Sequence, residues 1–289
     1  MALHIQSPFE WGWNRSKVTV SEVGAAKPDE YWSEASLHAG APAVRRIGVA
    51  DLKSALASGF EDFAANRSDV IFLCILYPLI GLVLGRLAFG YGMLPLLFPL
   101  AAGFTLVGPV AAIGLNEMSR RREQGAAVTW MDAFGVLRSP SLFAIVQLAA
   151  LLIGLFILWL VVADSLYNVT LGPEPPVSLT AFARDVFATG AGWTLIVAGI
   201  GVGFIFAVAV LVISVVSFPL LLDRPATVDI ALRTSLRAVG ANPGTMTLWG
   251  LIIAGSLVIG SIPFFLGLTI VLPVLGHATW HLYRRVVTS

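Results

Sequence analysis

The chain has 289 residues, of which 57% are hydrophobic and only 12% are charged, and its formal net charge at pH 7 is +1. This composition lies far from that of a water-soluble domain, and the near-neutral net charge indicates no nucleic-acid partner. The single cysteine, Cys74, excludes a disulfide framework and a CxxC metal or redox motif.

The first 44 residues are polar and contain three prolines. We expect residues 1–44 to form a mostly disordered cytoplasmic arm and residues 45–289 to form the membrane domain. Residues 1–20 contain no apolar core of signal-peptide length, so the first membrane span is expected to act as an uncleaved insertion signal.

The segment after Arg45 has helical periodicity. Its apolar residues recur at spacings of three and four, namely Val49, Leu52, Leu56, Phe60 and Phe63. Charged residues are expected on the other side, namely Asp51, Lys53, Glu61 and Asp62. The pattern predicts an amphipathic helix that is too short and too charged to span a bilayer and lies along its inner interface.

Six apolar stretches follow, and most are long enough to cross about 30 Å of hydrocarbon. They cover residues 69–88, 92–115, 141–163, 192–222, 245–262 and 264–283. The predicted fold is therefore all-α: a polytopic membrane protein with six transmembrane helices in three hairpin-like pairs, each preceded by a short amphipathic interfacial helix.

The basic residues are distributed unevenly about these stretches. Of the 18 Lys and Arg residues, only Arg86 and Arg184 fall on one side, and all the others fall on the other side. By the positive-inside rule, this asymmetry predicts a multi-pass protein of the bacterial inner membrane with both termini in the cytoplasm. Membrane lipids are the expected partners.

An amphipathic segment followed by two spans occurs three times. The segments are 52–63, 128–137 and 228–239, and each carries an alanine at a corresponding step, Ala55, Ala133 or Ala231. In the first and third copies an asparagine, Asn66 or Asn242, follows that alanine by eleven residues. This indicates a threefold repeat, although interfacial helices commonly precede spans and the match is also compatible with coincidence.

Proline and glycine predict local features of the spans. The fourth stretch would be about 46 Å long as one helix, so it should tilt, protrude or break near Pro219. Gly81 with Gly85, and Gly199 with Gly203, offer small faces for tight helix packing or for homo-oligomerisation. On the outer side, a candidate short helix carries Leu179, Phe182 and Val186 on one face, and residues 260–263 predict a tight hairpin.

Chemistry-bearing motifs are scarce. Glu117 and Asp164 sit at span ends, and no hydrolase, metalloprotease or kinase signature occurs in the sequence. Because intramembrane ionisable residues mark most ion-coupled transporters, a proton- or sodium-coupled transporter is disfavoured. We expect no enzymatic activity and no bound metal or cofactor.

His277 and His281 are the weak candidates for cofactor binding, because four-residue spacing places both imidazoles on one helix face. The alternative is a hydrogen-bonded structural role, with His281 close to the lipid headgroups and tolerant of substitution. Arg120, Arg121 and Arg122 are candidates for contact with lipid headgroups or a partner protein, and the alternative is a charge cluster that only fixes topology.

Several strings of the sequence resemble a family of bacterial integral membrane proteins designated DUF2189, over about residues 44–287. They are Arg45-Arg46-Ile47, Asp51-Leu52, 62–70, Tyr77-Pro78, 98–100, Gly108-Pro109, 117–120, 217–224, Asn242-Pro243 and 273–281. The resemblance implies a polytopic inner-membrane protein without an established function, and some relatives carry a cytochrome c oxidase label.

The sequence therefore favours a non-enzymatic accessory, assembly or scaffold component of the inner membrane, with another inner-membrane protein as a candidate partner. The first alternative is a facilitator or channel for a small or lipid-like solute. The second is a haem- or copper-binding accessory protein of a respiratory oxidase.

The charge asymmetry makes the topology testable. A periplasm-active reporter fused after Leu171 should be active, because this residue follows the third predicted span, whereas fusions after Arg122 or Arg237 should be silent. The measurement is reporter activity in intact cells, and the reverse pattern would overturn the six-span assignment.

Overall fold

The computed structural model describes residues 42–65, 86, 94–262 and 266–288, and in these ranges the chain is all-helical, as the sequence predicts. The α-helices are α3 (Val49–Ala65), α5 (Leu97–Glu123), α6 (Leu142–Thr170), α7 (Leu179–Ala188), α8 (Gly190–Ser214), α9 (Ser217–Asp223), α10 (Val228–Ala241), α11 (Pro243–Ser261) and α12 (Leu268–Val286). Two 3₁₀ helices, η2 (Leu94–Leu96) and η3 (Trp130–Arg138), complete the described elements.

Three of the described helical segments are long and apolar enough to cross a membrane. They are α6 with 29 residues, the segment Gly190–Asp223 formed by α8 and α9 with 34, and α11 with 19. These segments coincide with the third, fourth and fifth stretches of the sequence. The first stretch lies largely outside the described residues, and α5 and α12 cover the second and sixth. The six spans and their pairing thus stay predictions.

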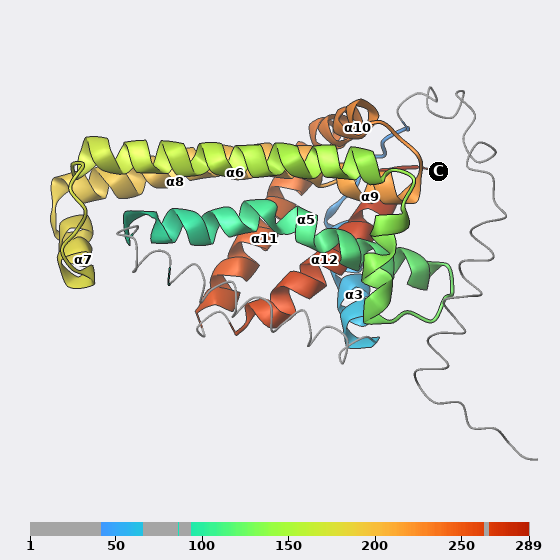
Figure 1. Ribbon diagram of the computed structural model, residues 1–289. Coiled ribbons are helices and arrows are strands. Elements are labelled where there is room, and N and C mark those ends of the chain that lie inside the picture. The colour runs from blue at the N-terminus through green and yellow to red at the C-terminus, as the bar shows by residue number, and fades with distance from the viewer. Residues whose placement is uncertain (1–41, 66–85, 87–93, 263–265, 289) are drawn as a thin grey trace, which may run out of the picture. The chain divides into compact units, whose positions relative to one another are not determined.

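A tryptophan joins α5, α6 and α8. α6 and α8 lie side by side (Figure 1), and Trp159 of α6 is buried between them and α5. Its indole nitrogen donates a hydrogen bond to the Pro99 carbonyl at 2.9 Å. A Cβ at Gly103 or Gly203 would lie 3.1 or 3.3 Å from this ring, so both glycines let the helices approach it.

The glycine face of α8 is thus used inside the chain. Gly199 lies against Leu166, and Gly203 lies against Trp159, both on α6. Of the two roles that the sequence predicted for this face, tight helix packing and homo-oligomerisation, these contacts correspond to tight helix packing. The other face, at Gly81 and Gly85, lies outside the described residues.

The break predicted near Pro219 is present. α8 ends at Ser214 and α9 begins at Ser217. Proline has no backbone N–H, and its ring clashes with the carbonyl four residues earlier, here that of Val215, so the helix cannot run straight through this position.

Serine hydroxyls replace the backbone hydrogen bonds lost at the break. Ser235 of α10 donates to the Val212 carbonyl at 2.6 Å and accepts from the Val216 N–H at 3.4 Å, so its hydroxyl stands between two groups that a regular helix would join. Ser217 similarly donates to the carbonyls of Ile213 and Ala231. Freed backbone groups at membrane depth need such partners because the hydrocarbon supplies none.

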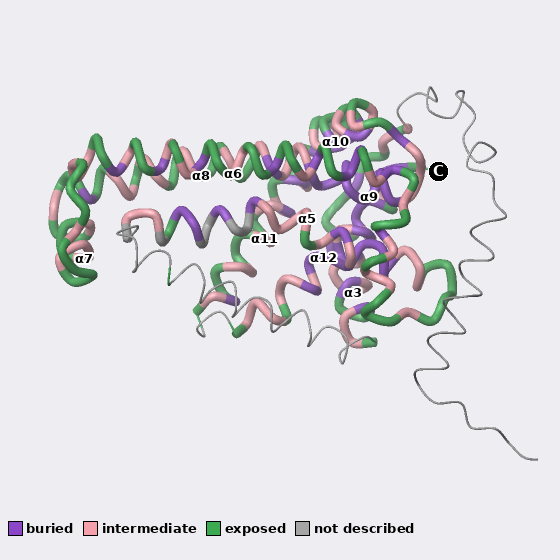
Figure 2. Tube along the Cα trace, in the orientation of Figure 1, coloured by how far each residue is buried: buried purple, intermediate pink, exposed green. Residues whose placement is uncertain are grey.

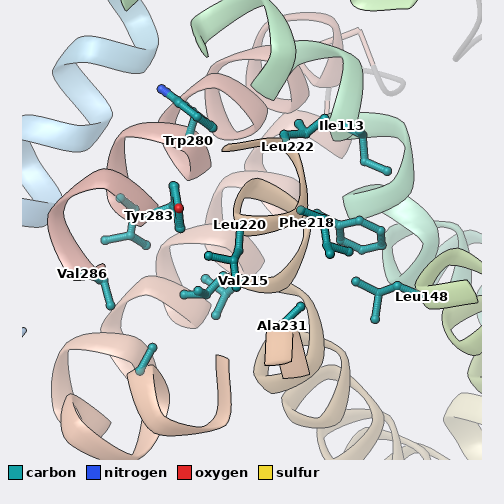
Figure 3. Packing of buried hydrophobic residues seen from close by; sticks show 14 of the residues in the cluster. Ile113, Leu148, Val215, Phe218, Leu220, Leu222, Ala231, Trp280, Tyr283 and Val286 are labelled. Carbon is teal, nitrogen blue, oxygen red and sulfur yellow. The ribbon is translucent and has the colours of Figure 1, made fainter. Parts of the chain in front are cut away.

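α9 occupies the centre of the hydrophobic core. All its residues from Ser217 to Leu222 are buried. Figure 3 shows Phe218 and Leu220 in the middle of side chains from several other helices, and the labelled residues around them are Ile113, Leu148, Ala231, Trp280, Tyr283 and Val286. Burial decreases along α6 and α8 away from this core (Figure 2).

The three predicted amphipathic segments are all helical, but they differ in type. α3 and α10 are α-helices in which Ala55 and Ala231 are fully buried, whereas η3 is a 3₁₀ helix whose Ala133 lies half-buried against Gly114. Asn242 ends α10 as expected. Asn66 lies outside the described residues, so the repeat stays a prediction.

The orientation predicted for α3 is wrong in one respect. Asp62, expected on the polar side, is 6% exposed and lies in one buried row with Leu52, Ala55 and Gly59. Phe60, expected on the buried side, is 56% exposed. Tertiary packing selects the row of small residues because it allows a closer approach than the row of large apolar ones.

We expect Ser235→Ala to lower the free energy of unfolding by about 1–3 kcal/mol, because it leaves the Val212 carbonyl and the Val216 N–H buried without partners. The measurement is the unfolding transition in detergent micelles. Ser214→Ala is the matched control, since the Ser214 hydroxyl only bonds the carbonyl of Val210 in its own helix. Equal effects of the two substitutions would contradict the role of Ser235.

Candidate functional site

A group of polar side chains lies near the contact between α3 and α12. A Cβ at Gly59 would lie 2.6 Å from the backbone nitrogen of Ala278, so the two helix backbones are in direct contact there. One turn further along each helix, Asp62 and His281 meet. The crossing therefore depends on a residue without a side chain, and it determines which polar groups become neighbours.

A buried carboxylate lies at the centre of the site. Asp62 accepts hydrogen bonds at Oδ2 from the Ser119 hydroxyl at 2.6 Å and from His281 Nε2 at 2.8 Å. Arg122 places Nη1 3.2 Å from Oδ1. We call these four residues together with His277 the Asp62 cluster.

The hydrogen-bond pattern assigns the tautomer of His277. The Ser119 hydroxyl has one proton, which it donates to Asp62, and its oxygen lies 2.8 Å from His277 Nδ1. Nδ1 must therefore carry a proton and donate it to Ser119. In the neutral ring this leaves Nε2 unprotonated, and this buried atom has no hydrogen-bond partner among the residues that the structure describes.

Electrostatics keep Asp62 ionised. Burial alone would raise the pKa of its carboxyl, but the hydrogen bonds from His281 and Ser119 and the nearby imidazoles lower the pKa below its ordinary value. Hydrogen bonds to the charged form outweigh desolvation here.

A second set of contacts joins the end of α12 to the ends of α5 and α9. Glu123 accepts from the indole of Trp280 at 2.8 Å and from Arg284 Nε at 3.0 Å. Asp223 accepts from the Tyr283 hydroxyl at 2.6 Å, and Arg284 also lies near it. Each carboxylate thus ends its own helix and is bound by α12.

The two ends of the described membrane domain are also joined. The Arg45 N–H donates to the Val286 carbonyl at 2.8 Å, and Val44 and Val287 form an isolated antiparallel bridge. The side chain of Asn242 accepts from the Ile47 N–H at 2.7 Å and donates to the Arg45 carbonyl.

The three arginines suggested by the sequence as lipid or partner contacts all bind carboxylates of the chain. Arg120 and Arg121 both contact Glu117 at 2.7 Å, and Arg121 also reaches Asp132 at 2.6 Å. Arg122 binds Asp62 and the Glu61 carbonyl. Glu117, expected at a span end, is buried between its two arginines.

His277 and His281 share a helix face, as expected, and both are hydrogen-bonded. His281 is part-buried against Asp62, which differs from the location among the headgroups that the sequence predicted. Within the described residues, no group of three or more His, Cys, Asp or Glu side chains has the geometry to hold a metal ion.

The Asp62 cluster joins α3, α5 and α12 through polar side chains. Ser119 is 1% exposed, and its hydroxyl is held between a carboxylate and an imidazole. The sequence interpretation missed Asp62, Ser119 and Asp223 as partners. A signal was present for Asp62, which continues the three-and-four spacing of Leu52, Ala55 and Gly59.

Residues 97–223 match the family model DUF2189, described as a predicted integral membrane protein. The match runs from α5 through α9 and confirms the resemblance over this part of the chain. No curated protein and no solved structure matches.

We expect Asp62→Asn to lower the free energy of unfolding by about 1–3 kcal/mol, because an amide cannot accept from all the donors that now surround the carboxylate. Glu61→Gln is the matched control: this neighbouring side chain is exposed, and its change should stay within about 0.5 kcal/mol. His281→Ala should be destabilising as well. Unfolding in micelles measures all three, and equal stability of the two amide variants would contradict the cluster.

The same pair of variants gives a pH dependence. Since the pKa of Asp62 is lower in the folded than in the unfolded state, its contribution is complete above an unfolded pKa of about 3.9 and is lost as the pH falls through the folded value. The difference in stability between wild type and Asp62→Asn should therefore be constant near neutrality and shrink below about pH 4. If this difference in stability instead grew as the pH fell, the pKa of Asp62 would not be lowered by folding.

Proposed function

We propose that this integral membrane protein is a non-enzymatic component of the bacterial inner membrane and acts as an accessory, assembly or scaffold protein. The observation that carries the proposal is the separation of its polar and apolar surfaces. The described buried ionisable groups are paired or hydrogen-bonded at one end of α5, α9 and α12, while few residues are buried in the most apolar windows of the segments that could span the membrane.

The exposed surface of α8 is the clearest part of this pattern. Only 6% of the most apolar window of Gly190–Asp223 is buried. One face of α8 packs on α6, and the opposite face carries a continuous exposed row, namely Trp193, Val197, Ile200, Phe204 and Val208. Such a surface suits contact with lipid or with the helices of another membrane protein.

The paired charges support the absence of catalysis. A nucleophile or general base needs an approach path for a substrate. Ser119 and Asp62 instead direct their hydrogen-bonding atoms at each other and at α12, in an environment that is nearly closed to solvent. We also propose the six-span topology with both termini in the cytoplasm, on the basis of the basic residues.

One observation favours the haem- or copper-binding alternative. His277 Nε2 is buried and has no hydrogen-bond partner in the described ranges of the chain, and imidazole Nε2 is a common ligand atom. The second imidazole does not support a shared ligand, because its Nε2 already donates to Asp62. We therefore rank this alternative below the scaffold proposal.

Photo-crosslinking in native membranes tests the proposal. A benzophenone amino acid replacing Phe204, which is 64% exposed, should give a discrete protein adduct that mass spectrometry identifies as another membrane protein. Phe206 is the matched control two residues away: its ring lies 5.5 Å from that of Trp159, so a probe there should crosslink only within the chain.

Two outcomes would overturn the scaffold proposal. Adducts with lipid alone at position 204, combined with solute flux in proteoliposomes, would favour a facilitator or channel. A Soret band or tightly held copper in the purified protein, abolished by His277→Ala, would favour the oxidase-accessory alternative.

A further inference from the structure

η3 presents an exposed apolar row next to a membrane-spanning candidate. Met131, Phe134 and Leu137 are 65%, 57% and 64% exposed. A 3₁₀ helix has three residues per turn, so residues three apart lie directly above one another. The three side chains therefore form one straight ridge.

The other two rows of η3 hold it in place. Ala133 and Val136 face the protein, with Ala133 against Gly114 of α5. Asp132 binds Arg121 at 2.6 Å, and a Cβ at Gly135 would lie 2.3 Å from the same guanidinium, so Arg121 can cross only because Gly135 has no side chain. The exposed ridge thus belongs to a fixed element.

The N-terminus of η3 is also fixed. The Asp132 carboxylate accepts from the N–H and hydroxyl of Thr129, as part of a capping box. Contacts within the protein therefore set the orientation of the ridge, whatever covers it.

The position of η3 indicates what covers the ridge. η3 ends at Arg138, and α6, a candidate span, begins at Leu142 with Phe143 75% exposed in its first turn. The ridge therefore lies at the boundary of the bilayer. Arg138 is exposed, and in the described part of the chain it forms no ion pair, unlike Arg120, Arg121 and Arg122.

We propose that Met131, Phe134 and Leu137 insert into the inner leaflet of the membrane and that Arg138 binds the headgroup of an anionic phospholipid. The apolar side chains determine how deeply η3 inserts into the bilayer. Arg138, the one unpaired cation of η3, gives the preference for anionic lipids. The lipid-binding arginine of this region is thus Arg138, whereas the triplet at 120–122 serves the interior of the protein.

Lipid is the occupant that these features fit best. The ridge is one residue wide and ends in a cation at the depth expected for phosphate groups, and Trp130, a residue enriched at membrane interfaces, flanks it. A protein partner would be expected to cover a broader surface.

Spin labelling of the full-length protein tests the insertion. In a Cys74→Ser background, Met131→Cys, Phe134→Cys and Leu137→Cys carry a nitroxide in nanodiscs of phosphatidylethanolamine and phosphatidylglycerol. We expect the labels to be accessible to oxygen and protected from a water-soluble nickel chelate, at a depth of about 5–10 Å. Gln124→Cys, at an exposed polar position, is the control and should show the opposite accessibility.

The outcomes distinguish whether lipid, water or protein contacts the ridge. Nickel accessibility equal to that of Gln124→Cys would show a solvated ridge and overturn the proposal. Protection from both reagents would show a protein cover, either a second copy or another part of the chain, and would overturn it too.

The charge is tested separately with the label at position 134. One arginine near an anionic surface is worth about a fivefold preference for the membrane, so Arg138→Gln should reduce the ratio of inserted to detached label about fivefold in phosphatidylglycerol. It should have no effect in phosphatidylcholine. Arg233→Gln, which removes an exposed charge from α10, is the control and should change neither. Equal effects of the two substitutions would remove Arg138 from the proposal.

Discussion

The buried carboxylate of Asp62 organises the end of the helix assembly. An ionised carboxylate out of water is costly unless donors surround it, and Asp62 receives donors from α5 through Ser119 and Arg122, and from α12 through His281. The helices that supply these donors cannot move apart without exposing the charge to an apolar surrounding. Contact of α3 with α12 at Gly59 and Ala278 makes this geometry possible, because any side chain at position 59 would separate them.

A similar requirement shapes the helix break beside the core. Pro219 frees backbone groups of α8 and α9, and the hydroxyl of Ser235 satisfies two of them. α10 is thus attached to α9 by a polar contact as well as by packing. Since α9 lies among α5, α6, α10 and α12, the break and the Asp62 cluster meet in one region: Asp223 ends α9 and binds Tyr283 of α12, one turn from His281 and Trp280.

Local signals in the sequence predicted much of this fold. Apolar stretches predicted the positions of α6, α8 and α11, and Pro219 predicted the break. Amphipathic patterns such as the three-and-four spacing of apolar residues in α3 predicted the interfacial segments. These features depend on a few neighbouring residues, and so they can be read without tertiary information. The contact of Arg121 with Gly135 of η3 could not be predicted, because the two residues lie on different elements.

The candidate site was predicted less completely than the fold. His277 and His281 were recognised from their spacing, but their partners lie on α3 and α5, which are distant in the sequence. Asp62 was assigned to solvent because a charged residue on an amphipathic helix usually lies on the polar face. The ionic partners of residues 120–122 likewise come from three different elements, so the sequence could show their charge but not their pairing.

The pairing divides the arginines of this region into two groups: residues 120–122, which bind carboxylates of the chain, and the exposed Arg138. A positive charge at the end of a span can fix topology whether or not it is paired, because the charge itself resists translocation. In the proposed topology, Arg121 and Arg122 would contribute to orientation, and through Asp132 and Asp62 they contribute to the internal structure at the same time. An exposed cation such as Arg138 has only the membrane surface available, and its effect on the protein must consequently depend on lipid composition. Pairing inside the protein thus distinguishes residues 120–122 from Arg138, although all four lie next to candidate spans.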